Sequence, residues 1–112
     1  MPFVKENTFW AEILDIYDLT TIKIKRNIII YICVIADIII PTDLYPDIYS
    51  IIYNNIVQRI KGQIILCKKA QGHKLLYLYD MQNEEIINNW INNMNYKWSN
   101  IVPISITIIP TI

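Results

Sequence analysis

The feature that constrains this chain most is an almost continuous apolar run between Asn27 and Ile40. It reads Asn-Ile-Ile-Ile-Tyr-Ile-Cys-Val-Ile-Ala-Asp-Ile-Ile-Ile, and most of its side chains are β-branched. Such side chains favour a pleated strand over a helix. The run is also interrupted by Asp37 and is shorter than the roughly 20 apolar residues that a membrane-spanning helix needs. We therefore predict a strand over residues 28–36 that is central in a sheet or covered on both faces.

Two further strands are predicted before this run, at residues 9–17 and 20–25, where apolar and polar residues alternate. In the second of them Ile22 and Ile24 would point inward, and Lys23 and Lys25 outward. Short turns at residues 18–19 and 26–27 would join the three strands.

A helix is predicted from Ile48 to Lys61, with Asp47 as its N-cap. Gly62 follows in the position where a left-handed residue ends a helix. One face carries an apolar stripe at spacings of three and four, formed by Ile48, Ile51, Ile52, Ile56 and Ile60.

The second half of the chain predicts a hairpin and a second helix. Strands at residues 63–69 and 73–79 are separated by Ala-Gln-Gly, a typical hairpin connection. Asn83 is expected to cap a helix that ends near Asn93, with Glu84 and Glu85 in its first turn. Three strands, a helix, two strands and a helix is the order of a small five-stranded OB-type Greek-key barrel, an α+β fold.

The 112 residues, 54% hydrophobic and 18% charged, fit one domain with a core and exclude a disordered chain. Residues 1–98 are predicted to form that domain, and residues 99–112 an extended apolar tail. Ile104, Ile106 and Ile108 of the tail alternate with polar residues between Pro103 and Pro110, as in an edge strand. We expect this strand to add to a neighbouring subunit or a partner protein; the alternative is that it folds back on its own barrel.

Charge and cysteine usage exclude several functions. Ten basic and ten acidic residues cancel, which argues against a dedicated electrostatic DNA binder. Cys33 and Cys67 lie far apart and the chain has one histidine, so we predict buried free thiols and no zinc site. No signal peptide or membrane span is visible, which favours an intracellular protein. Isoleucine and asparagine are abundant, as in an AT-rich genome, and suggest a protein of a large DNA virus, such as a virion component.

Five segments resemble motifs of one family in the same order: residues 12–24, 31–42, 61–66, 72–79 and 87–96. The first resembles a hairpin with an Asp-Gly-Asp-Thr turn. Lys-Gly-Gln-Ile-Ile-Leu at 61–66 resembles the point where a helix ends and the next strand begins. The family is that of the staphylococcal (micrococcal) nuclease, whose fold is an OB-type barrel with packed helices. The likeness covers roughly residues 9–98.

The departures from that family concern its chemistry. Its active members hold calcium with two aspartates, activate water with a glutamate and neutralise the phosphate with two arginines. The resemblance places these five positions on Thr20, Val34, Ile39, Thr42 and His73, none of which is the expected residue. It therefore implies a nuclease-like scaffold that lacks the catalytic residues, holds no metal or cofactor, and performs no calcium-dependent cleavage.

The sequence favours a domain reused for protein interaction or structure, with two alternatives. One is a divergent phosphodiesterase with relocated residues. The other is a module for single-stranded nucleic acid, in which Tyr77 or Tyr79 would stack on bases beside a basic face. That face would consist of Lys23, Lys25, Arg26, Lys68, Lys69 and Lys74.

Overall fold

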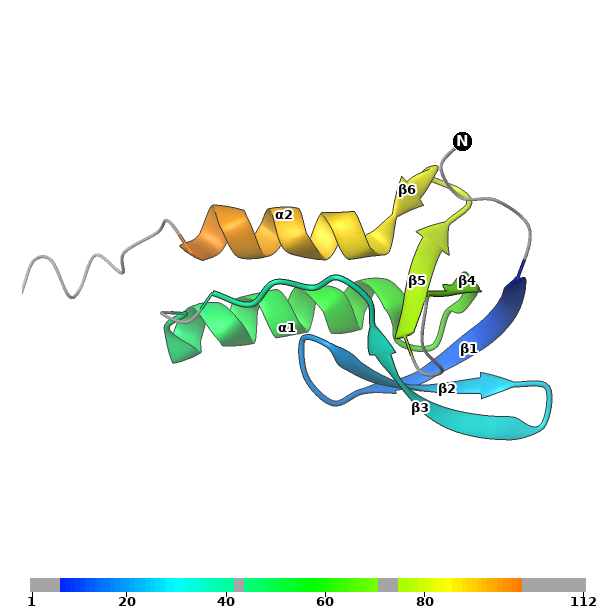
Figure 1. The fold of residues 1–112 in the computed structure, drawn as a ribbon. Helices are drawn as coiled ribbons and strands as arrows, with labels where there is room; N and C mark the ends of the chain where they lie inside the picture. The colour runs from blue at the N-terminus through cyan, green and yellow to red at the C-terminus, as the bar shows by residue number, and fades with distance from the viewer. Residues whose placement is uncertain (1–6, 42–43, 71–74, 100–112) are drawn as a thin grey trace, which may run out of the picture.

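The computed structural model describes residues 7–41, 44–70 and 75–99 (Figure 1). Five strands close into a mixed β-barrel, and two helices run beside each other on one side of it. This architecture agrees with the OB-type barrel that the sequence predicts. The elements are β1 (Thr8–Ile16), β2 (Thr21–Arg26), β3 (Ile29–Ile35), α1 (Pro46–Ile60), β4 (Ile64–Lys69), β5 (Leu75–Asp80), β6 (Glu85–Ile86) and α2 (Ile87–Ser99).

A short parallel contact between β3 and β5 closes the barrel. The strand order is β3-β2-β1-β4-β5-β6, and all the neighbours in this order are antiparallel. The parallel pairing joins Val34 to Leu75 and Ile35 to Leu76. Farther along β5, the same edge is taken by the two residues of β6. Within the described residues, β3 therefore has a second neighbour only at its C-terminal end.

The core lies between the interior of the barrel and the two helices. Inward-facing strand residues such as Ile13, Ile22 and Ile24 are at most 1% exposed. One face of each helix packs into the same hydrophobic cluster. Ile51, which the sequence places on the apolar stripe of α1, is not part of that face and is 41% exposed. The buried apolar helix residues are Ile48, Ile52, Ile56, Ile60, Ile87, Ile91 and Met94.

The ends of α1 confirm one predicted signal and correct another. Gly62 has a φ of 81°, the left-handed conformation expected after the helix. Asp47 is not the N-cap: the helix begins at Pro46, its cap is Tyr45, and no side chain bonds to the first turn. The proline is favourable there because its fixed φ suits the first helical position. Asp47 lies inside the first turn, where its charge still suits the helix dipole.

The second helix begins later and ends later than the sequence predicts. Asn83 does not cap it, because its amide and backbone N–H both donate to Asp80 in a tight loop. Glu84 has a left-handed φ of 52°, and Glu85 pairs with β5. The helix therefore starts only at Ile87 and continues to Ser99.

Three asparagines along α2 hold the chain that leaves β3. Asn88 donates to the carbonyl oxygens of Ala36 and Leu76 and accepts a hydrogen bond from the N–H of Leu78. One turn farther on, Asn92 donates to Asp37 O and accepts from Ile39 N, and Asn95 donates to Ile39 O. We call these three residues the asparagine ladder. They fix the path of residues 36–39 along the helix through backbone groups alone.

Both cysteines are buried and neither is in a disulfide among the described residues, as the sequence predicts. Burial raises the pKa of Cys67 to about 12, with a smaller contribution from nearby Cys33. A thiol with such a pKa is protonated and unreactive at neutral pH.

Candidate interaction surface on the third strand

The third strand is apolar but not covered, which corrects the sequence prediction. Ile29, Ile30 and Ile32 are 52%, 53% and 55% exposed, and Ile28 in the turn before them is 90% exposed. Only Cys33 and Ile35, at the C-terminal end, are buried. We call the exposed group the β3 edge surface; it consists of Ile28, Ile29, Ile30, Tyr31, Ile32 and Val34.

The backbone of β3 offers hydrogen-bonding groups along the same stretch. Ile35 N donates to Thr20 O on the β2 side, whereas Ala36 N donates to Leu76 O on the β5 side. Because successive residues of a strand direct their N–H and C=O groups to opposite sides, the groups of Ile30 and Ile32 point away from β2. In the described part of the chain no strand is paired with them on that side.

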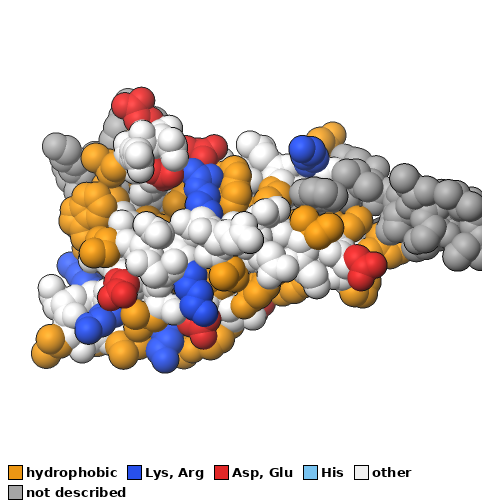
Figure 2. All heavy atoms as spheres, turned by 180° about the vertical axis from the view of Figure 1, so that it is seen from behind, with side chains coloured by type: hydrophobic (Ala, Val, Ile, Leu, Met, Phe, Trp, Pro, Cys, Tyr) orange, Lys and Arg blue, Asp and Glu red, His pale blue; other side chains and the backbone are white. Residues whose placement is uncertain are grey.

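The turn between β2 and β3 projects this surface from the barrel (Figure 1). Asn27 has a φ of 56°, which asparagine tolerates better than most residues, so a two-residue turn joins the strands. Arg26 lies over the ring of Phe9, 4.1 Å from its centroid. Figure 2, which views the molecule from behind, shows apolar side chains between lysines and arginines at this end, at the lower left.

Two of the basic residues proposed for nucleic acid lie beside acidic ones. Lys25 is opposite Glu12 and Lys23 is opposite Asp15 on β1. Lys61 also lies 3.4 Å from Asp15. Local compensation of this kind weakens the field that a polyanion needs. Of the others, Arg26 stacks on Phe9, Lys68 and Lys69 lie on β4, and Lys74 lies outside the described residues.

Two of the five positions that the resemblance assigns to nuclease catalytic residues lie close together. Thr20 directly precedes β2 and its carbonyl oxygen accepts a hydrogen bond from Ile35 N, while Thr21, the first residue of β2, is paired with Val34 of β3. Ile39 lies farther along the chain, beside α2, with its side chain 74% exposed. Thr42 and His73 fall outside the described residues, as do Ile104, Ile106 and Ile108 of the tail.

Asp18 stabilises the turn between β1 and β2. Its Oδ1 accepts hydrogen bonds from the N–H groups of Thr20 and Thr21 and from the Thr20 hydroxyl, at 2.8–3.0 Å. Partial desolvation raises the pKa of Asp18, but these hydrogen bonds outweigh it and hold the pKa below its ordinary value. Its carboxylate is therefore used in local structure. No group of three or more His, Cys, Asp and Glu side chains suited to a metal occurs among the described residues.

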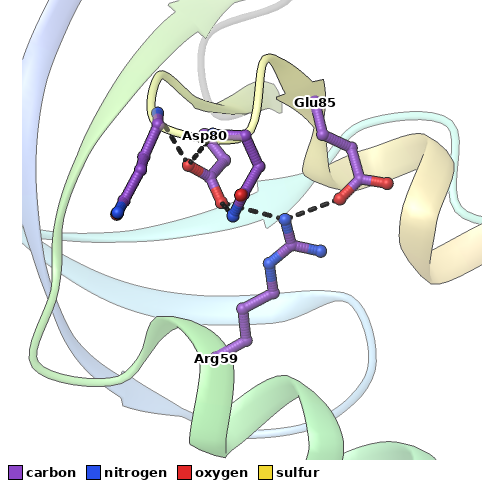
Figure 3. Close-up of polar contacts among 5 residues, drawn as sticks. Arg59, Asp80 and Glu85 are labelled. Atoms are coloured by element: carbon purple, nitrogen blue, oxygen red, sulfur yellow. Dashed lines mark hydrogen bonds and ion pairs between the residues drawn. The ribbon is translucent and has the colours of Figure 1, made fainter.

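A second polar cluster joins α1 to the loop after β5 (Figure 3). Arg59 lies 2.9 Å from Asp80 and 2.6 Å from Glu85, and its guanidinium lies 4.5 Å from the centre of the Trp90 ring. Arg59 and Asp80 border an open hollow of about 460 Å³ that Trp10 also lines. Because two carboxylates already neutralise Arg59, the hollow does not present a free cation to an anionic ligand.

The cluster predicts how stability depends on pH. Desolvation raises the pKa of Asp80, but hydrogen bonds from Arg59 and Asn83 outweigh it and lower the pKa to about 2. A carboxyl group with a lowered pKa stabilises the fold above its ordinary value of 3.8, and this stabilisation is lost as the pH falls towards 2. Asp80→Asn should therefore reduce the free energy of unfolding by about 1 kcal/mol at pH 7.

Urea unfolding of the wild type and of Asp80→Asn at pH 7, 4 and 2.5 checks this prediction. The difference between the two proteins should shrink across that series. Asp47→Asn, which changes an exposed carboxylate in α1, is the matched control. A difference for Asp80→Asn that stays constant down to pH 2.5 would contradict the assignment.

No protein-family model, curated protein or solved structure matches this chain. The described part of the chain has no helix of the length and apolar character required to cross a bilayer.

Sequence reasoning missed the β3 edge surface although it singled out the strand. The alternation of side chains tells which residues share a face, but it does not tell which strand lies on each edge. One signal was available: Ile-Ile-Ile-Tyr-Ile follows a tight turn directly, and the end of a hairpin commonly extends beyond the strands around it.

Proposed function

We propose that this chain is a protein-interaction module that binds a partner polypeptide in extended form along β3. One observation carries the proposal: residues 29–32 expose apolar side chains while their outward backbone groups face no paired strand of the described residues. Exposed strand edges pair readily with other chains, and proteins normally blunt them with charge, proline or a bulge. None of these three devices occurs in β3 itself, where all seven residues are apolar.

The resemblance to the staphylococcal nuclease family also supports this proposal, because the residues at the family's catalytic positions differ here. We propose that the barrel is a nuclease-like Greek-key scaffold whose catalytic positions have been replaced. Thr20 supplies a hydroxyl that bonds to Asp18, and Val34 and Ile39 supply aliphatic side chains, which bind neither calcium nor phosphate. In this proposal the rim of the barrel keeps the shape of a nuclease site but lacks the catalytic residues. Binding is then the function that the rim can still perform.

The binding mode would be strand addition. Backbone hydrogen bonds to Ile30 and Ile32 would supply affinity that does not depend on sequence, and alternate side chains of the bound segment would supply selectivity. The row of Ile30, Ile32 and Val34 on the outer face favours β-branched or aromatic residues in the bound strand. Association through this surface should depend little on salt, unlike phosphate contacts.

A random peptide library displayed on phage tests the proposal. We expect enriched peptides to have alternating β-branched residues and to slow amide exchange of Ile30 and Ile32 in the full chain. Parallel selection against Ile30→Glu/Ile32→Glu is the control, because each new carboxylate would lie opposite a lysine of β2 and should leave the barrel folded. Equal enrichment on both proteins, or protection located elsewhere, would contradict the proposal.

A further inference from the structure

We infer that the polypeptide bound by the β3 edge surface is β3 of a second copy of this chain. The inference rests on the proposed function and names its partner. Two copies would meet in antiparallel orientation about a twofold axis, so that the β2–β3 hairpins form one continuous four-stranded sheet. A twofold interface uses the same patch on both subunits and therefore requires a surface that is complementary to itself.

The backbone of β3 meets that requirement. Ile30 and Ile32, two residues apart, direct their backbone groups away from β2, to the side on which no described strand is paired with them. Placing Ile30 opposite Ile32 of the second copy lets the two residues exchange both N–H···O=C bonds. The twofold axis repeats this for the other pair. The same register satisfies the outward groups of both residues in both chains, in four hydrogen bonds.

The side chains suit the same register. Tyr31 would lie opposite its own copy in a non-hydrogen-bonded pair, where side chains approach most closely. It is 42% exposed, so ring surface is available for an aromatic cross-strand contact. On the other face Ile30 and Ile32 would pack against each other across the axis. β-Branched side chains are well suited to such cross-strand contacts.

The charges near the edge do not oppose this arrangement. Lys23 and Lys25 lie on β2, one strand away from the edge, and each is opposite an acidic residue of β1 in its own chain. The chain as a whole has no net charge at pH 7. Two copies therefore approach without long-range repulsion, and no like charges are brought face to face at the axis.

The exposed area predicts a weak but specific dimer. From their exposed fractions, the six residues of the β3 edge surface present roughly 600 Å² of mostly apolar surface, at the upper end for a patch on a monomer. Burying all of it on both copies would remove at most about 1,200 Å², because Val34, which would lie opposite Ile28, is already paired with Leu75 of its own chain. This ceiling equals the lower limit of the standard interface size. We therefore expect dissociation in the micromolar range.

Sedimentation equilibrium of the full chain across micromolar concentrations is the first test. We expect a reversible monomer–dimer equilibrium, weakened at least about 100-fold by Ile30→Glu/Ile32→Glu because like charges would meet at the axis. Ile51→Glu changes an equally apolar, exposed residue of α1 and should leave the dimer unchanged. Circular dichroism and thermal melting of each variant establish that it is folded.

A symmetric cross-link provides the second test and does not depend on the charge variant. Opposed residues of a non-hydrogen-bonded pair have Cα atoms about 4.5 Å apart, within the range that a disulfide spans. Under mild oxidation Tyr31→Cys should form a covalent dimer at least tenfold faster than Ile51→Cys. Cys33 and Cys67 are buried and contribute little background.

Three outcomes would overturn the inference. The wild type could be monomeric throughout, or Tyr31→Cys could cross-link no faster than the control. A dimer abolished by Ile106→Glu but not by the β3 variant would show that the tail is the bound strand. In the first case a peptide selection that still depends on β3 leaves the proposed function standing, with another protein as the partner.

Discussion

Ile52→Ala should lower the free energy of unfolding by about 3–4 kcal/mol, because it removes a fully buried side chain from the centre of the core. Ile52 lies on α1 at 0% exposure and packs in the cluster that unites both helices with the barrel. The substitution deletes three carbon atoms and leaves a cavity that the surrounding strands cannot fill completely. Urea unfolding at pH 7 measures the change, and thermal melting should fall by about 10–15 °C.

The neighbouring residue supplies a matched control for this effect. Ile51→Ala makes the same chemical change on the same helix, but Ile51 is 41% exposed. Its cost should remain below about 1 kcal/mol. Equal effects at the two positions would mean that the orientation of α1 is wrong.

Asn88→Ala should be nearly as damaging, although the residue is polar. Asn88 is 1% exposed and makes three hydrogen bonds of 2.8–3.0 Å to backbone groups of β5 and Ala36. Alanine would leave the N–H of Leu78 and the carbonyl of Ala36 without these partners. Each buried, unpaired backbone group costs about 1–3 kcal/mol, so we expect a loss of about 3 kcal/mol.

Asn92→Ala tests whether burial is the cause of that loss. Asn92 makes the same type of bonds one turn later, to Asp37 and Ile39, but in a solvent-exposed setting where water can replace the amide. We expect about 1 kcal/mol from the same unfolding measurement. If Asn92→Ala matched Asn88→Ala, the ladder would act through helix propensity and not through satisfying buried groups.

Much of the fold could be predicted because its signals are local. The alternation in β2, the apolar spacing of α1 and the glycine after it each depend on a few neighbouring residues. The start of α2 could not be found in this way. Asn83 and two glutamates have the composition of a helix start, but Asp80 binds Asn83 in its own loop and Glu85 pairs with β5. These contacts with β5 therefore override the local sequence signal for the start of the helix.

One part of the candidate site could likewise be predicted from the sequence, and another part could not. The positions that the nuclease resemblance assigns to catalytic residues stay a prediction, and the structure places two of them, Thr20 and Val34, near each other at one end of β3. Exposure of β3 could not be predicted, because a run of β-branched residues looks the same whether two sheets, one sheet or a partner covers it. Only the pairing of β5 with the last two residues of β3 shows where coverage ends.

The asparagine ladder shows that the path of one segment is determined by residues far away in the sequence. The amides of Asn88, Asn92 and Asn95 bond to main-chain atoms, which every residue type except proline provides in full. The route of residues 36–39 is therefore encoded in α2, more than fifty positions later in the chain. Ile39 is 74% exposed and is held through its backbone, so in a deep mutational scan it should accept many side chains, while Asn88, which is buried against the segment, should accept few. A surface position of this kind can acquire new chemistry without disturbing the barrel.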